Sequence, residues 1–173
     1  MILKQLLERL EYEVVQGSDK IEITTLINDS RKVEEGSVFV CISGAVSDGH
    51  QYVADVAKKG AKAVIVQQDV EAPAGMTVIR VEDTRYALAL ASAAYFGYPA
   101  EKLHIIGITG TKGKTTTTYM IKSILEGVGH KVGLIGTIEA IIGEEVIPAA
   151  STDASQILIF PLAHAISIAE AAA

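Results

Sequence analysis

The sequence predicts an α/β fold in two parts: a small N-terminal α/β domain and, after it, a truncated P-loop-type domain built on a parallel sheet. Two observations support this fold class. Short apolar runs typical of strands alternate with helical patterns along the chain. A glycine-containing loop, ITGTKGKTTTTY at residues 108–119, follows the apolar run 103–107 and precedes a helical pattern, which is the order of a phosphate-binding loop between a strand and a helix.

The composition is that of an ordinary globular protein, with 173 residues, 49% hydrophobic and 21% charged. A net charge of -6 argues against binding to nucleic acid or to an anionic membrane. The N-terminus lacks the apolar segment of a signal peptide and no stretch could span a membrane, so we expect a cytoplasmic monomer. Cys41, alone in the apolar run VFVCI, is expected in the core, and the four histidines have no metal-ligand spacing.

The N-terminal part is expected to begin with a helix, because apolar residues recur there at three- and four-residue spacing: Leu3, Leu6, Leu7 and Leu10. Strands are expected at residues 21–27, 38–42, 63–66 and 77–81, with a helix around 52–57. Asp83 or Thr84 can cap an alanine-rich helix that ends near Gly97, where Tyr98 and Pro99 break it. We place a domain boundary there, between residues 1–97 and 98–173.

The second part reads as strand 103–107, loop, helix to about Glu126 and strand 131–135, a βαβ unit that implies a parallel sheet. Segments 137–142 and 145–147 resemble a hairpin around Gly143 and Glu144. The apolar, alanine-rich residues 157–173 carry no motif and suit a helix against the sheet. One βαβ unit leaves its sheet largely uncovered, so this domain is expected to be incomplete.

The chemistry of the loop rests on a few residues. Gly110 and Gly113 allow the backbone to approach phosphates, Lys114 can reach the outer phosphates, and the Thr115 hydroxyl is placed to hold Mg²⁺. The general P-loop pattern is not met, because Ile108 stands in place of its first glycine. The alternative is a glycine turn with a surface lysine. The four threonines 115–118 argue against that alternative, since β-branched residues begin a helix poorly without another purpose.

Several segments together resemble the Mur ligases, ATP-dependent enzymes that add amino acids to the UDP-linked muramoyl precursor of peptidoglycan. Residues 109–116 fit the family's loop TGT-x-GKTT, which departs from the general P-loop in the same way. Residues 28–53, NDSRKVEEGSVFVCISGAVSDGHQYV, resemble the UDP-binding domain of the ligases that add the third residue and the terminal dipeptide. Residues 133–143, GLIGTIEAIIG, are similar to the third-residue enzyme. The resemblance covers about residues 1–152.

The resemblance implies a UDP-muramoyl substrate-binding domain at 1–97 and the N-terminal part of a central ATP-binding domain at 98–173. It assigns the ATP phosphates to seven residues: Gly110, Thr111, Lys112, Gly113, Lys114, Thr115 and Thr116. Among them Lys114 is the catalytic residue and Thr115 the Mg²⁺ ligand. It assigns substrate contacts to Asn28, Ser30, Ala45, Val46, Ser47, Ser151 and Thr152. The neighbouring residues Asp29, Arg31, Asp48 and Gly49 are equally well interpreted as ordinary turn formers.

The implied reaction is amide formation through an acyl-phosphate, in which ATP activates the terminal carboxylate of UDP-N-acetylmuramoyl-L-alanyl-D-glutamate for L-lysine or meso-diaminopimelate. In the family a metal-holding glutamate, a carboxylated lysine and a C-terminal domain lie beyond the region matched here. We therefore expect the isolated chain to be inactive, and the unmatched sequence after Gln156 to reflect a truncation or reading-frame shift.

Three other functions stay open. The sister ligase that adds D-alanyl-D-alanine shares the first-domain segments but differs after the loop. A non-catalytic module that binds a UDP-sugar or nucleotide would use the same residues without ligation. A generic P-loop kinase would leave residues 1–97 unexplained.

Overall fold

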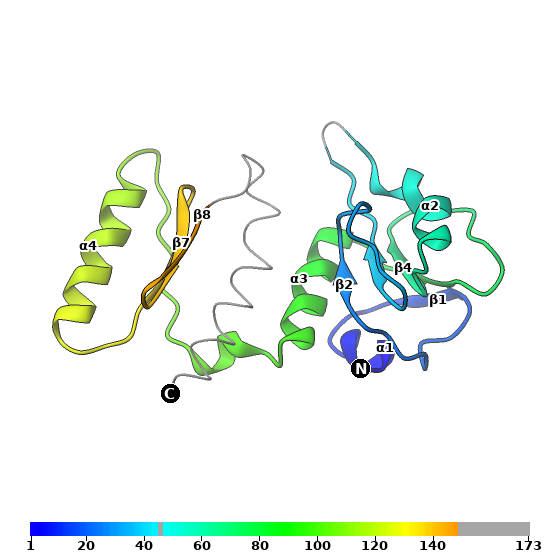
Figure 1. The fold of residues 1–173 in the computed structure, drawn as a ribbon, viewed down its shortest axis with the longest axis horizontal. Helices are drawn as coiled ribbons and strands as arrows, with labels where there is room; N and C mark the ends of the chain where they lie inside the picture. The colour runs from blue at the N-terminus through cyan, green and yellow to red at the C-terminus, as the bar shows by residue number, and fades with distance from the viewer. Residues whose placement is uncertain (45–46, 149–173) are drawn as a thin grey trace. The chain divides into compact units, whose positions relative to one another are not determined.

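The computed structural model describes residues 1–44 and 47–148, and the chain divides into two compact units, Met1–Tyr95 and Phe96–Ala173 (Figure 1). Each unit is described here by itself. No helix within the described ranges is long and apolar enough to cross a membrane. The predicted segment 157–173 and the candidate residues Ala45, Val46, Ser151 and Thr152 lie outside the described residues.

The first unit is built on a five-stranded sheet. Its strands are β1 (Glu13–Gln16), β2 (Leu26–Ile27), β3 (Val38–Val40), β4 (Ala63–Val66) and β5 (Thr77–Arg80). They lie in the order β1-β5-β4-β3-β2, with β2 to β5 parallel to one another and β1 antiparallel to β5. All residues of β3 and β4 are buried, as expected of central parallel strands covered on both faces.

Helices cover both faces of this sheet (Figure 1). The short helix α2 (Val53–Lys58), which follows the 3₁₀ turn η1 (Gly49–Tyr52), places Val53 and Val56 in one core cluster with Phe39 and Val64. The long helix α3 (Thr84–Tyr95) contacts β2, β4 and α1 (Leu3–Leu6). Because side chains alternate along a strand, Val38 and Ile65 point away from the α2 cluster, toward this second layer. The predicted α/β class with a parallel sheet is confirmed.

The prediction of a buried Cys41 is also confirmed. Its side chain lies in the α2 cluster, and burial, with a smaller contribution from the charge of Asp48, raises the pKa of the thiol to about 12. The thiol therefore stays protonated at neutral pH and acts as a small apolar side chain.

Two N-terminal elements differ from prediction. The first helix ends at Leu6 rather than near Leu10, and β1 follows it where no strand was expected. β1 forms because its backbone pairs with β5, a contact between distant segments that its exposed EVVQ sequence does not indicate. The strand expected at 21–27 is reduced to β2, with a single bridge between Glu22 and Ile2 before it. The strands at 63–66 and 77–80 and the helix from Thr84 match the prediction.

The second unit contains a 3₁₀ turn, one long helix and three strands. They are η2 (Pro99–Lys102), α4 (Lys114–Gly127), β6 (Gly133–Ile135), β7 (Glu139–Ile142) and β8 (Glu145–Pro148). The sheet order is β6-β7-β8 with both pairs antiparallel, and α4 contacts β6. The predicted helix and the predicted hairpin around Gly143 are confirmed.

The strand expected at 103–107 is absent, and with it the parallel βαβ pair. These residues have no regular structure, and Ile105 and Ile106 are 65% and 59% exposed. A parallel strand needs a neighbour on its edge and cover on both faces. Within residues 96–148 the strand β6 pairs with β7 instead, and no strand or helix covers Ile105 or Ile106. An apolar run alone therefore does not form a strand here.

Candidate functional site

The phosphate loop depends on two glycines with positive φ. Gly110 has φ 151° and Gly113 has φ 76°. A Cβ added at Gly113 would meet no atom within 4 Å, so the constraint is the left-handed backbone and not crowding. Gly113 is also the N-cap of α4, where it offers no side chain to the first helical turn.

The N-terminus of α4 is therefore open. The first hydrogen bond of the helix runs from the Thr117 N–H to the Gly113 carbonyl at 2.9 Å. The described residues provide no acceptor for the backbone N–H groups of Lys114, Thr115 and Thr116. Three unpaired donors at the positive end of a 14-residue helix form a ready site for an anion.

The four threonines divide into two pairs. The Thr117 hydroxyl donates to the Gly113 carbonyl at 2.9 Å, and the Thr118 hydroxyl donates to the Lys114 carbonyl at 2.6 Å. These bonds to the preceding turn tie both side chains to their own helix. The hydroxyls of Thr115 and Thr116 make no hydrogen bond with any other described residue. Of these four hydroxyls, only those of Thr115 and Thr116 thus lack a partner among the described residues and are available to a ligand.

The Lys114 side chain folds back over the loop and donates from Nζ to the Gly110 carbonyl at 2.6 Å. This bond joins the two ends of the predicted binding segment, and Thr111 and Lys112 lie exposed between them. The seven residues predicted to bind the nucleotide therefore run from this loop into the first turn of α4. The bond to Gly110 uses one of the three donors of the Lys114 ammonium, so two remain for a phosphate.

Hydrogen bonds define the C-terminus of α4 and connect the helix to β7. Its C-terminus closes with bonds from the Gly129 N–H to the Glu126 carbonyl and from the His130 N–H to the Leu125 carbonyl, and Gly129 has φ 90°. Tyr119 donates from its hydroxyl to the Glu139 carboxylate on β7, and this hydrogen bond raises the pKa of Tyr119. The loop is thus attached to a helix with a defined end and a contact to the adjacent sheet.

A metal would have few protein ligands here. No group of three or more His, Cys, Asp or Glu suited to a metal occurs in the described part of the chain. The unpaired Thr115 hydroxyl suits Mg²⁺, which is commonly bound through one or two protein oxygens together with substrate phosphates.

Three of the candidate substrate residues, Asn28, Ser30 and Ser47, lie at one edge of the first sheet. Asn28 and Ser30 follow β2, and Ser47 lies on the loop that follows β3. Because β2 and β3 are parallel neighbours, both segments leave the sheet at the same carboxyl edge, where ligands of α/β proteins usually bind. Ser47 is held by a 3.0 Å hydrogen bond between its Oγ and the Tyr52 hydroxyl.

Asp29 and Arg31 form a turn, as the alternative interpretation expects. Asp29 Oδ1 accepts from the Arg31 N–H at 3.0 Å and from Arg31 Nε at 2.9 Å, and Oδ2 accepts from Nη2 at 2.8 Å. The side-chain hydrogen bonds from Arg31 are the main cause that lowers the pKa of Asp29 to about 2. Lys59 donates from Nζ to the Ser30 carbonyl at 2.7 Å and so fixes the next residue of the turn.

Gly49 must be glycine for steric reasons. A Cβ there would lie 2.7 Å from the Ile42 nitrogen and 3.0 Å from Cys41 Cα. Its N–H donates to the Ile42 carbonyl at 2.9 Å, which closes the base of the loop after β3. The turn interpretation of Gly49 is thus supported by a close backbone approach.

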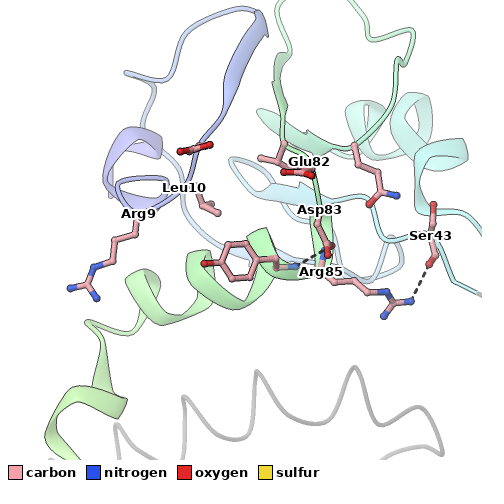
Figure 2. A pocket seen from close by; sticks show the side chains of 10 residues that line it. Arg9, Leu10, Ser43, Glu82, Asp83 and Arg85 are labelled. Atoms are coloured by element: carbon pink, nitrogen blue, oxygen red, sulfur yellow. Dashed lines mark hydrogen bonds between the residues drawn. The ribbon is translucent and has the colours of Figure 1, made fainter.

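Sequence reasoning missed four residues at this edge: Ser43, His50, Gln67 and Arg85. Ser43, Gln67 and Arg85 line a cleft of about 840 Å³ together with Asp83 and Tyr86 (Figure 2). Arg85 reaches from α3 to the Ser43 carbonyl, to which Nη2 donates at 3.0 Å. Ser43 and Gln67 each follow a predicted strand, and the structure shows these strands to be parallel neighbours, so both residues lie at the carboxyl edge where ligands of such sheets usually bind.

Comparison with known families places these features in context. Residues 14–96 match the model of the "Mur ligase family, catalytic domain", and residues 108–161 match the "Mur ligase middle domain". Together the two matches cover most of the chain. This chain belongs to the Mur ligase family.

Relatives within the Mur ligase family match the chain over most of its length. A UDP-N-acetylmuramoyl-L-alanyl-D-glutamate--2,6-diaminopimelate ligase from Clostridium perfringens is 51% identical over 152 residues, which are 88% of this chain and 31% of that protein. A crystal structure of MurF from Acinetobacter baumannii is 30% identical with a TM-score of 0.55, covering 79% of this chain and 30% of that one. The chain thus spans about a third of the length of the Mur ligases it matches.

The overall fold of the chain has a broader match. A structure of a UDP-N-acetylmuramoyl-L-alanyl-D-glutamate--2,6-diaminopimelate ligase aligns with a TM-score of 0.68 and covers 97% of this chain and 33% of that one. At 22% identity this likeness concerns the fold alone.

Proposed function

We propose that this chain is the N-terminal portion of an ATP-dependent ligase that adds the third amino acid to UDP-N-acetylmuramoyl-L-alanyl-D-glutamate during peptidoglycan precursor synthesis. One observation supports this most strongly: a relative named for that substrate and for 2,6-diaminopimelate is 51% identical over 152 residues. Its name favours meso-diaminopimelate over L-lysine as the amino acid added. A cytoplasmic location and a monomeric state belong to the same proposal.

In this proposal the two units bind different ligands. Residues 1–97 bind the UDP-muramoyl substrate at the carboxyl edge of the first sheet, through Asn28, Ser30 and the loop that carries Ser47. Residues 98–173 form the N-terminal part of the ATP-binding domain. The candidate contacts Ala45, Val46, Ser151 and Thr152 remain predictions of the same kind.

The loop suits its proposed ligand because the backbone N–H groups of Lys114, Thr115 and Thr116 have no acceptor among the described residues. In the proposed reaction the γ-phosphoryl group of ATP would pass to the substrate carboxylate with release of ADP, and the incoming amine would then attack the acyl carbon and displace inorganic phosphate to form the amide. The N–H groups of Lys114 to Thr116 would bind phosphate oxygens, Lys114 would neutralise the outer phosphates, and Thr115 would hold Mg²⁺. The chain's contribution is to position and neutralise these oxygens.

Isothermal titration calorimetry of the 173-residue chain tests both halves of the proposal. We expect binding of UDP-N-acetylmuramoyl-L-alanyl-D-glutamate in preference to the same nucleotide carrying the tripeptide, which the sister ligase extends. We expect Mg-ATP binding to be lost in Lys114→Ala and kept in Lys122→Ala, a lysine farther along α4 that pairs with Glu126. Preference for the tripeptide ligand would favour the sister ligase. If Lys114→Ala still binds Mg-ATP, Lys114 does not belong to the binding site.

Ligation itself needs more than the loop. We expect the 173-residue chain alone to release no phosphate coupled to product, because it spans about a third of the relatives' length. Binding without turnover would match this expectation, whereas amide formation by the chain alone would contradict it. A non-catalytic binding module would show the same binding. The two alternatives are distinguished by assaying a protein that carries this chain and has the full length of the relatives: amide formation favours the ligase, and its absence favours the binding module.

A further inference from the structure

The turn after β2 offers two polar side chains to a ligand. Asn28 and Ser30 are half-buried, and neither the Asn28 amide nor the Ser30 hydroxyl forms a hydrogen bond with another described residue. Both groups can therefore bind a polar ligand without first breaking a bond within the chain. Where they point depends on how the backbone of the turn is held.

Inside the turn, the hydrogen bonds all go to Asp29. Its Oδ1 accepts from the Arg31 N–H at 3.0 Å, and its carbonyl accepts from the Lys32 N–H at 3.0 Å. The Arg31 guanidinium also donates to the Asp29 carboxylate. These bonds set the local shape of the turn, but they do not fix it relative to the sheet, because both partners of each bond lie within residues 29–32.

The end of helix α2 supplies the bond from outside the turn. Lys59, the C-cap residue of α2, donates from Nζ to the Ser30 carbonyl at 2.7 Å, across 29 residues of sequence. Within the part of the chain that the structure describes, this is the one hydrogen bond that joins residues 29–32 to another segment. The position of the turn thus depends on Lys59.

The helix end that carries Lys59 is itself held close to the same connection. The Gly36 N–H donates to the Gly60 carbonyl at 2.8 Å, and a Cβ added at Gly60 would lie 3.0 Å from Glu35 Cα. Val33, which is 9% exposed, belongs to the same core cluster as Val53 and Val56 of α2. The segment that follows the turn is therefore packed against α2, and Lys59 extends this contact to the turn.

We propose that Lys59 is a positioning residue for the substrate: by donating to the Ser30 carbonyl, it sets where the Asn28 and Ser30 side chains meet the uridine ligand. The inference rests on the proposed function for its ligand, and on hydrogen bonds between described residues for its geometry. Because Nζ binds a backbone carbonyl, Lys59 acts through Ser30 and need not touch the ligand.

Lys58 provides a matched control. It is the preceding residue of α2, and its Nζ lies 3.7 Å from Oδ1 of Asp55 on the same helix. Lys58→Met therefore removes the same charge from the same helix end and leaves the bond to Ser30 in place. Lys59→Arg keeps a cationic donor on a long side chain. An effect of Lys59→Met alone thus reports the bond to Ser30, and not the loss of a cation near the C-terminus of the helix.

The test combines calorimetry with UDP-N-acetylmuramoyl-L-alanyl-D-glutamate and NMR of the ligand-free 173-residue chain. We expect Lys59→Met to weaken affinity about fivefold. Backbone order parameters of residues 30–32 should fall from about 0.85 to about 0.6. The amide nitrogen of Arg31 should change its chemical shift, because it shares a peptide group with the Ser30 carbonyl.

The control variants should behave differently. Lys58→Met and Lys59→Arg should keep affinity within about twofold of the wild type and leave the order parameters unchanged. All three variants should keep the wild-type thermal midpoint, because Lys58 and Lys59 are exposed. A change in binding then cannot be ascribed to unfolding.

The possible outcomes separate this inference from the proposed function. Unchanged affinity in Lys59→Met, or an equal fall in Lys58→Met, would overturn the positioning role while the proposed function stands. Weaker binding with unchanged order parameters and an unchanged Arg31 shift would also overturn it, since Lys59 would then act on the ligand directly. If the wild-type chain does not bind the uridine ligand, the proposed function fails and the substrate role of Lys59 fails with it, while NMR still decides whether Lys59 holds the turn.

Discussion

Helices α3 and α4 have similar lengths, 12 and 14 residues, but their N-termini are built in opposite ways. In α3 the Asp83 carboxylate accepts from the N–H groups of Arg85 at 2.7 Å and Tyr86 at 3.2 Å, and Gln67 accepts from Thr84. In α4 the cap is Gly113, and no described side chain takes up the first N–H groups. The N-terminus of α3 is thus closed by side chains of its own chain, whereas at the candidate anion site of α4 no described side chain takes up these donors.

The two helices differ in burial as well. α3 has six buried residues: Thr84, Ala87, Leu88, Ala91, Ser92 and Ala94. α4 has none, and its apolar side chains Met120 and Ile124 are 62% and 67% exposed. The difference shows that the first unit contains both layers needed to cover its sheet, while residues 96–148 do not provide cover for α4.

Matched truncations of apolar side chains should show the largest contrast between the helices. Leu88 is 4% exposed and Ile124 is 67% exposed. We expect Leu88→Ala to cost about 2–5 kcal/mol of unfolding free energy through a core cavity, and Ile124→Ala to stay within about 0.5 kcal/mol. Urea unfolding followed by circular dichroism measures both. Equal losses in the two variants would show that α4 is packed in a way the structure does not contain.

Acid should act on the first unit through Asp48. Hydrogen bonds, first of all from the His50 side chain, lower the pKa of Asp48 from 3.8 to about 2. The carboxylate thus stabilises the fold above about pH 4, and this stabilisation is lost as the pH falls toward 2. With allowance for partial solvent screening, we expect a loss of about 1–2 kcal/mol, absent in Asp48→Asn. Unfolding midpoints between pH 5 and pH 2.5 check this, and an identical slope in the variant would contradict it.

A smaller effect is expected from the cap of α3. Asp83→Ala removes the acceptor for the Arg85 and Tyr86 N–H groups and should cost about 1 kcal/mol. Asp83→Asn, which keeps a capping oxygen, should recover most of this loss. Thermal unfolding of the three proteins decides the point. If Asp83→Ala matches the wild type, side-chain closure does not distinguish α3 from α4.

The smallest effect should come from the contact between α4 and β7. Tyr119→Phe removes the hydrogen bond to Glu139, and because Tyr119 is 36% exposed we expect the thermal unfolding midpoint to stay unchanged. The chemical shifts of the α4 amides should move little in this variant. A large loss of helix content would mean that this contact, rather than the helix itself, holds the loop in position.

Local patterns predicted the parts of the fold whose stability is local or deeply buried. The all-apolar segment 63–66 and the alanine-rich helix after Asp83 carry their structure in their own periodicity. The strand β1 was missed because its polar sequence gains order only from β5. The strand at 103–107 was wrongly expected because the run is apolar, whereas a buried strand also needs neighbours.

The candidate site shows the same division. The candidate phosphate loop could be proposed from the sequence because its glycines, lysine and threonine are near neighbours there. The Asp48, His50 and Gln67 network could not, because β4 brings Gln67 to His50 from a distant part of the chain. The pairing of Thr117 and Thr118 with backbone carbonyls also required the helix to be seen.

The central claim is that one chain carries two separate binding edges, the carboxyl edge of the first sheet and the open N-terminus of α4. Amide chemical-shift mapping of the 173-residue chain tests it most directly. UDP-N-acetylmuramoyl-L-alanyl-D-glutamate should shift amides in 28–31 and 43–50, and Mg-ATP should shift those in 110–117 while leaving Thr84 to Tyr86 unmoved. Shifts from Mg-ATP at the closed N-terminus of α3, or none in 110–117, would contradict the claim.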